Sequence, residues 1–151
     1  MPLSPNEVNF LQDNTKKVLE LWMRTRLAFL KAFASDRPSQ EQEDAYLNLK
    51  SEISRLYRMI SERLPPGLMF EGDKMLESLK NAMTLEHLHR QSATERQILM
   101  VLWHRIYIKI TRTVGALEVM QSGYYPHLHR QLMRAPDDDA TAKGKKKARA
   151  A

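Results

Sequence analysis

The apolar residues of this chain recur at alternating spacings of three and four, and this period constrains the fold more than any other feature. Between residues 5 and 34 the line consists of Val8, Leu11, Thr15, Val18, Trp22, Thr25, Phe29 and Ala32. Such spacing places one side chain per turn on one face of an α-helix. Ser4 before Pro5, with Glu7 three residues later, predicts where this helix begins, and Pro38 predicts a stop before residue 38.

A second helix is predicted from about Gln40 to Arg63, because the same spacing continues there and the run Pro65-Pro66-Gly67 follows. Its stripe consists of Tyr46, Leu49, Ile53, Leu56 and Ile60. A third helix is predicted to begin near Asp73, with Met75, Leu76, Leu79 and Met83 on one side. Glu86 and Arg90 interrupt this stripe, so the pattern leaves the end of the third helix open.

Ser92, followed three residues later by Glu95, is typical of a capping box and predicts a break before a fourth helix. That helix is predicted from Ala93 to about Gln121. Its apolar line consists of Leu99, Leu102, Ile106, Ile110, Val114 and Leu117. One continuous helix across Ser92 is the alternative.

Four amphipathic segments joined by short breaks predict an all-α fold, an up-and-down four-helix bundle formed by residues 1–134. Residues 135–151 contain three Asp and five Lys or Arg, and they contain no apolar residue larger than alanine. We therefore expect a disordered basic C-terminal tail. The chain contains no cysteine, and its most apolar stretch carries three basic or histidine residues, so we expect a cytoplasmic protein without a membrane span.

Charge is distributed unevenly in the second half of the chain. Between Arg96 and Pro136 the single acidic residue is Glu118, whereas the basic residues are Arg96, Arg105, Lys109, Arg112, Arg130 and Arg134. Three of them share one face of the fourth helix, and the tail adds Lys143, Lys145, Lys146, Lys147 and Arg149. This pattern predicts contact with an anionic partner, RNA or DNA being one class. The alternative is a solvated face, or one paired with acidic residues of a neighbouring helix.

A pentapeptide occurs twice, as His-Leu-His-Arg-Gln at residues 87–91 and 127–131. Histidines two apart on a helix point about 200° apart, so His87 and His89 cannot hold one ion together. In an extended segment His127 and His129 would share a side, and a histidine of the third helix would complete a metal site. We treat a metal site built from His87, His89, His127 and His129 as a minor hypothesis, and we expect no cofactor.

The sequence contains no glycine-rich phosphate loop, no nucleophile elbow and no zinc-protease motif, so we do not expect an enzyme. The first hypothesis is a non-catalytic helical-bundle adaptor or scaffold that acts through protein contacts and self-associates. Thr15, Trp22 and Thr25 would mark a face shared with a second copy. An apolar patch left exposed on the first or fourth helix would favour this hypothesis. The alternative is a nucleic-acid-binding bundle.

Overall fold

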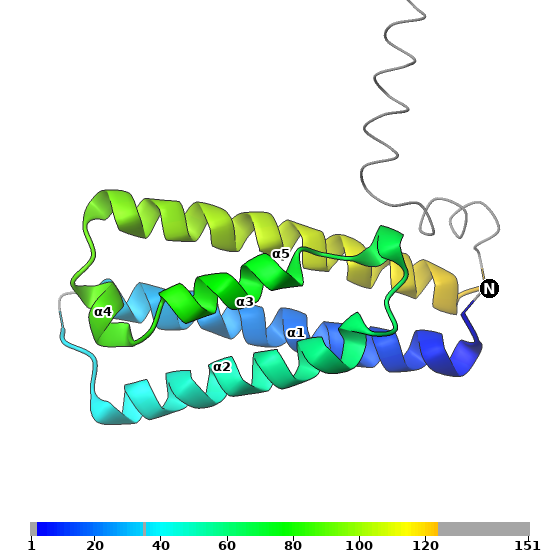
Figure 1. Cartoon of the computed structure of the whole chain (residues 1–151), viewed down its shortest axis with the longest axis horizontal. Helices are drawn as coiled ribbons and strands as arrows, with labels where there is room; N and C mark the ends of the chain where they lie inside the picture. Colours follow the sequence, from blue (N-terminus) through cyan, green and yellow to red (C-terminus); the bar gives the residue numbers. More distant parts are fainter. Residues whose placement is uncertain (1–2, 35, 124–151) are drawn as a thin grey trace, which may run out of the picture.

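The computed structural model describes residues 3–34 and 36–123, and this part of the chain is all-α. Its helices are α1 (Pro5–Ala32), α2 (Gln40–Ser61), the 3-10 helix η1 (Pro66–Leu68), α3 (Gly72–Asn81), α4 (Leu85–His89) and α5 (Ala93–Gln121). The three long helices lie side by side, and α1 runs in the opposite direction to both α2 and α5 (Figure 1). The short segments η1, α3 and α4 connect α2 to α5 and close the remaining side of the core.

The predicted third helix is divided into two short helices. Helix α3 ends at Asn81, and α4 begins after Thr84, whose side-chain oxygen accepts a hydrogen bond from the backbone N–H of His87. This local capping explains why the apolar stripe of the third segment fades at Glu86. The described chain therefore has five α-helices instead of four.

Serine caps fix the three long helices where the sequence indicates. The side chains of Ser4, Ser39 and Ser92 accept hydrogen bonds from the backbone N–H groups three residues later, which satisfies donors that a helix leaves free at its start. The break at Ser92 is confirmed, and a continuous helix across it is excluded. Helix α1 ends at Ala32, before the stop predicted at Pro38, and α2 ends at Ser61, two residues before the predicted Arg63.

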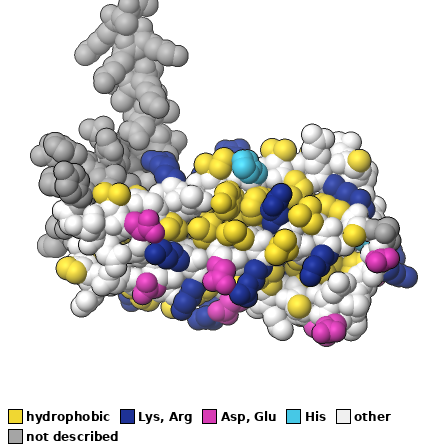
Figure 2. All heavy atoms as spheres, turned by 180° about the vertical axis from the view of Figure 1, so that it is seen from behind, with side chains coloured by type: hydrophobic (Ala, Val, Ile, Leu, Met, Phe, Trp, Pro, Cys, Tyr) yellow, Lys and Arg dark blue, Asp and Glu magenta, His cyan; other side chains and the backbone are white. Residues whose placement is uncertain are grey.

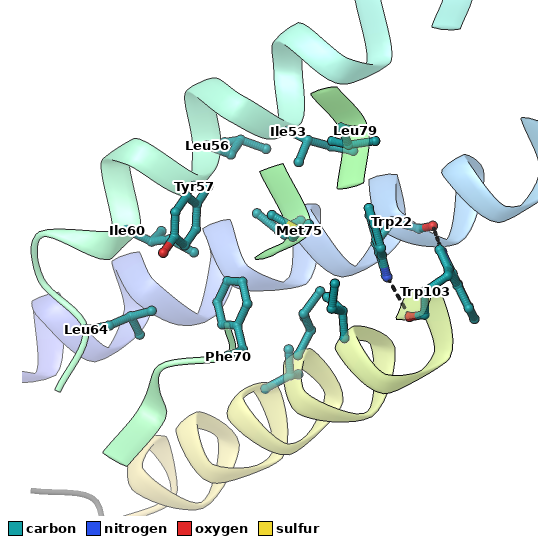
Figure 3. Packing of buried hydrophobic residues seen from close by; sticks show 14 of the residues in the cluster. Trp22, Ile53, Leu56, Tyr57, Ile60, Leu64, Phe70, Met75, Leu79 and Trp103 are labelled. Carbon is teal, nitrogen blue, oxygen red and sulfur yellow. Dashed lines mark hydrogen bonds between the residues drawn. The ribbon is translucent and has the colours of Figure 1, made fainter. Parts of the chain in front are cut away.

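The core lies around α1, and every residue of its predicted apolar line is buried. Trp22 of α1 and Trp103 of α5 hold the two helices together through reciprocal hydrogen bonds (Figure 3). The indole N–H of Trp22 donates to the carbonyl oxygen of Trp103 at 3.1 Å, and that of Trp103 donates to the carbonyl oxygen of Trp22 at 2.8 Å. Their rings are parallel within 10°.

The line of α1 does not offer a face to a second copy. Thr15 and Thr25 are fully buried within the single chain, and Trp22 is almost fully buried. Thr25 donates its hydroxyl to the carbonyl oxygen of Leu21, which satisfies that polar group inside the helix. The prediction that these three residues mark a face shared with a second copy was wrong, because their spacing along α1 reflects packing against α2 and α5 of the same chain.

Candidate functional site

Two of the predicted basic residues on α5 contact a carboxylate of the same chain. The Nζ atom of Lys109 lies 2.6 Å from Oε1 of Glu71, and Nη2 of Arg105 lies 3.2 Å from the same oxygen. Lys74 of α3 shares this carboxylate at 3.4 Å. The hydrogen bond from Lys109 is the main cause that lowers the pKa of Glu71 below its usual range, and the charges of Arg105 and Lys74 add to it.

The chain between η1 and α3 aims Glu71 at α5. Glu71 has a left-handed backbone conformation, with φ 55° and ψ 40°, which is uncommon for a residue with a side chain. The next residue, Gly72, packs under the ring of Tyr57, where a Cβ atom would overlap that ring. A tight turn under an aromatic ring therefore holds the carboxylate beside Lys109. Glu71 is 34 residues from Arg105, so spacing along the sequence gave no sign of this pairing.

Arg112 continues the basic stripe and lies at a cavity of about 300 Å³ beside this ion-pair cluster. It is exposed, and it has no salt bridge within residues 3–34 and 36–123. Asp73 lines the same cavity, and its negative charge adds to burial in raising the pKa of Tyr57 above its usual range. Of the stripe's three cations, Arg112 is thus the one that the described chain leaves without a carboxylate partner.

Arg96 has a structural position at the opposite end of the molecule. Its guanidinium donates to the carbonyl oxygens of Phe33 at 3.2 Å and His89 at 2.8 Å, and it lies 4.9 Å from the centre of the Phe33 ring. These contacts cap the last turns of α1 and α4. Arg96 therefore connects three helix ends and does not join the stripe of Arg105, Lys109 and Arg112.

The two described histidines of the repeated pentapeptide point to different surroundings. The Nδ1 atom of His89 donates to the carbonyl oxygen of Ala32 at 2.8 Å, which joins α4 to the end of α1. His87 lies on the other side of the short helix and supplies its N–H to the Thr84 cap. Within the described ranges no three His, Cys, Asp or Glu side chains are grouped as metal ligands. The predicted ligands His127 and His129 lie outside the described residues.

The remaining basic residues of the predicted contact surface follow the last described helix. Arg130 and Arg134 of the predicted bundle, and all five basic residues of the predicted tail, lie outside the described residues. Among the helices that the structure describes, none combines the length and the apolar character that crossing a membrane requires.

Helix α5 carries apolar residues on two faces, which the sequence analysis did not separate. Its inner line is buried against α1 and the short helices. A second line recurs at spacings of three and four on the outside, and Ile98, Val101 and Ile108 on it are 65%, 63% and 53% exposed. We call this line the outer seam; it consists of Ile98, Val101, Arg105, Ile108, Arg112, Gly115 and Val119. The signal was present in the sequence, but it overlaps the basic stripe and was read as charge alone.

A groove between α1 and α5 adjoins the outer seam and has a volume of about 550 Å³. Trp103 lines this groove, with Tyr107 stacked on it at 5.1 Å between ring centres. Met23 and Leu27 of α1, both exposed, line the groove from the other side. Figure 2 shows this face, where apolar side chains form a patch across the middle of the molecule with Lys and Arg side chains among them.

Comparison with known proteins gives no family for this chain. No protein-family model, no curated protein and no solved structure matches it.

Proposed function

We propose that this chain is a non-catalytic adaptor or scaffold that binds other proteins through helix-to-helix contact. The observation that carries the proposal is the exposed outer seam of α5, joined to the apolar groove between α1 and α5. A helix that is apolar on both faces is ordinarily buried on both. Single exposed apolar residues are common on soluble proteins, whereas an aligned set marks an interaction surface. The occupant to which we commit is a helix of another protein.

The proposed adaptor uses a compact scaffold to present this surface. In the finer architecture that we propose, α3 and α4 together occupy the third position of an up-and-down bundle. Within residues 3–34 and 36–123, α5 then has neighbours on its inner side and none on its outer side. The seam is then held straight by the pairing of α1 with α5. Self-association, the second part of the sequence hypothesis, stays a prediction that the molar mass in solution would decide.

A pair of matched variants tests the adaptor function. Ile108→Asp places a charge in the outer seam, and Leu47→Asp places the same charge at a comparably exposed apolar position on α2. Proteins that co-purify with the full chain are themselves purified and their affinities measured. We expect them to bind the wild-type and Leu47→Asp chains with equal affinity. Their affinity for the Ile108→Asp chain should be at least tenfold weaker, a loss of roughly 1.4 kcal/mol. The proposal fails if the chain is monomeric and no purified protein binds it through Ile108.

Nucleic-acid binding is the second candidate, and the observation in its favour is exposed Arg112 at the end of a stripe with few acidic neighbours. Glu71 counts against it, because this carboxylate already engages Arg105 and Lys109. Fluorescence anisotropy with labelled RNA and duplex DNA, over a series of salt concentrations, would separate the two. If α5 contacts the nucleic acid, Arg112→Glu should reduce the slope of log affinity against log salt concentration by about one, the value for one lost phosphate contact. If neutralising Lys143, Lys145, Lys146, Lys147 and Arg149 abolishes binding instead, the bundle itself has no role in it.

A further inference from the structure

We infer that the outer seam of α5 takes an acidic amphipathic helix of a different protein, and that it disfavours a second copy of this chain. This inference rests on the proposed function and specifies its partner. It depends on three observations: the regular spacing of the seam, the two arginines within it, and the excess of positive charge on the α3 side of α5.

The spacing of the seam fits a helix as its occupant. The seven positions alternate by three and four from Ile98 to Val119, which is the spacing by which two helices pack along a shared line. The apolar members Ile98, Val101, Ile108 and Val119 are all β-branched and all exposed. The line runs over 22 residues, and its ends lie roughly 30 Å apart at 1.5 Å per residue. A partner helix of about three heptads would cover it.

The arginines decide between a second copy and a different protein. Arg105 and Arg112 are seven residues apart, so they occupy equivalent positions in successive repeats of the seam. In a parallel pair of identical helices, each arginine would face the same arginine of the other copy. In an antiparallel pair, each would lie against Val101, Ile108 or Gly115 of the other copy, and the seam supplies no carboxylate to either arrangement. Arg105 keeps Glu71 of its own chain as a partner, whereas Arg112 has no carboxylate partner among the described residues. Burying the charge of Arg112 without a partner is costly, so self-pairing through this seam is disfavoured.

The surroundings of the seam add to the positive field on its α3 side. Lys74, Arg105 and Lys109 share the single carboxylate of Glu71, which leaves these four groups with a net positive charge. Arg112 adds one more cation, and Asp73 is the other carboxylate of the neighbouring cavity. A partner helix with Glu or Asp seven residues apart would place one carboxylate near each arginine. Its remaining contact positions would be apolar, to match the β-branched residues.

Selection from a displayed peptide library tests the partner's chemistry without requiring its identity. The library consists of helical peptides of about three heptads with apolar residues at the contact positions. At two positions seven apart, and at the flanks, codons for Glu and Lys are equally frequent. The full chain is the target, and the Leu47→Asp chain is the matched control for an unrelated exposed apolar position.

We expect the enriched peptides to carry Glu at the two positions, and to bind the wild-type and Leu47→Asp chains alike. Ile108→Asp should abolish their binding. The double variant Arg105→Glu/Arg112→Glu should reverse the preference to Lys by about tenfold, as expected for two partly exposed ion pairs. Circular dichroism of each variant, compared with the wild type, establishes that the bundle is still folded.

Failure of this inference can be distinguished from failure of the proposed function. If the enriched peptides depend on Ile108 but show no preference for Glu, the acidic partner is wrong while the adaptor function stands. The same holds if the wild-type chain forms dimers that Ile108→Asp dissociates, because the occupant is then a second copy. If no peptide is enriched through Ile108 and the chain is monomeric, both the inference and the proposed function are wrong.

Discussion

Replacing Trp22 by Phe should destabilise the fold by about 2 kcal/mol, half of it from one lost hydrogen bond. The bond from the Trp22 indole to the carbonyl oxygen of Trp103 is buried, and such a bond contributes about 1 kcal/mol to the free energy of unfolding. The smaller ring also leaves a cavity of roughly 40 Å³, which costs about 1 kcal/mol at 24 cal/mol per Å³. Trp22 is 1% exposed, so solvent cannot fill the space from outside.

The matched variant is Trp103→Phe, which loses the equivalent hydrogen bond. Trp103 is 6% exposed and lines the groove, so neighbouring groove side chains can close around the smaller ring. We therefore expect a cost of about 1 kcal/mol, from the hydrogen bond alone. Each indole donates to the carbonyl oxygen of the other tryptophan, and the two rings are stacked. The costs of the two substitutions are therefore coupled, and the double variant should depart from their sum by about 0.5 kcal/mol or more.

Urea unfolding followed by circular dichroism at 222 nm measures these differences. For a slope of about 2 kcal/mol per molar urea, Trp22→Phe should lower the midpoint by roughly 1 M and Trp103→Phe by roughly half as much. Each single variant keeps one tryptophan, so its fluorescence provides an independent transition. Equal costs for the two variants, or a cost below about 0.5 kcal/mol for Trp22→Phe, would refute the reasoning about burial and hydrogen bonding.

Five further variants test other parts of the structure by the same urea assay. Thr15 is fully buried and its hydroxyl has no hydrogen-bond partner among the described residues, so Thr15→Val should stabilise the fold by about 1 kcal/mol, whereas Thr25→Val, which removes a satisfied hydroxyl, should not. Glu71→Gln should destabilise the fold at pH 7. The pKa of Glu71 is lowered in the folded state, so the stability that its carboxylate provides is present above the unfolded-state pKa. The difference in stability from wild type should therefore vanish as the pH falls through the folded-state pKa. Gly72→Ala should destabilise the fold by about 1–3 kcal/mol, because the added Cβ overlaps the ring of Tyr57. Gly115→Ala, where a Cβ meets no other atom, should stabilise the fold by about 0.5–1 kcal/mol. Similar effects at both positions would contradict this packing.

The all-α fold and the three long helices were predictable from the sequence because helix caps and apolar lines are each formed by residues close together in the chain. The helix starts follow from Ser4 and Ser92, each with a glutamate three residues later. The whole predicted line of α1 is buried, whereas the predicted line of α5 is buried from Ile106 onward and half-buried at Leu99 and Leu102. The division of the third segment was missed because Thr84 caps a helix of five residues, too short for a period to be recognised. The spacing of apolar residues gives little indication of a helix this short.

The candidate surface was predictable only in part, because exposure depends on contacts distant in sequence. The basic stripe of Arg105, Lys109 and Arg112 was visible as a pattern, but its engagement by Glu71 depends on a turn 34 residues earlier than Arg105. The apolar members of the outer seam share a helix with the buried line, and only the packing of α1 and α3 shows which line faces inward. Exposed large apolar side chains lie on both α1 and α5.

The reciprocal tryptophan bonds have a mechanical consequence for the pair of long helices. Each indole is anchored to backbone of the opposite helix, so sliding α1 past α5 by one residue, about 1.5 Å, would break both bonds at once. Rotation of either helix about its axis would break them as well. Force applied to one helix should therefore reach the other without slippage, and thermal motion of the two should be correlated. Any hinge in the described chain is then expected in the connection formed by η1, α3 and α4.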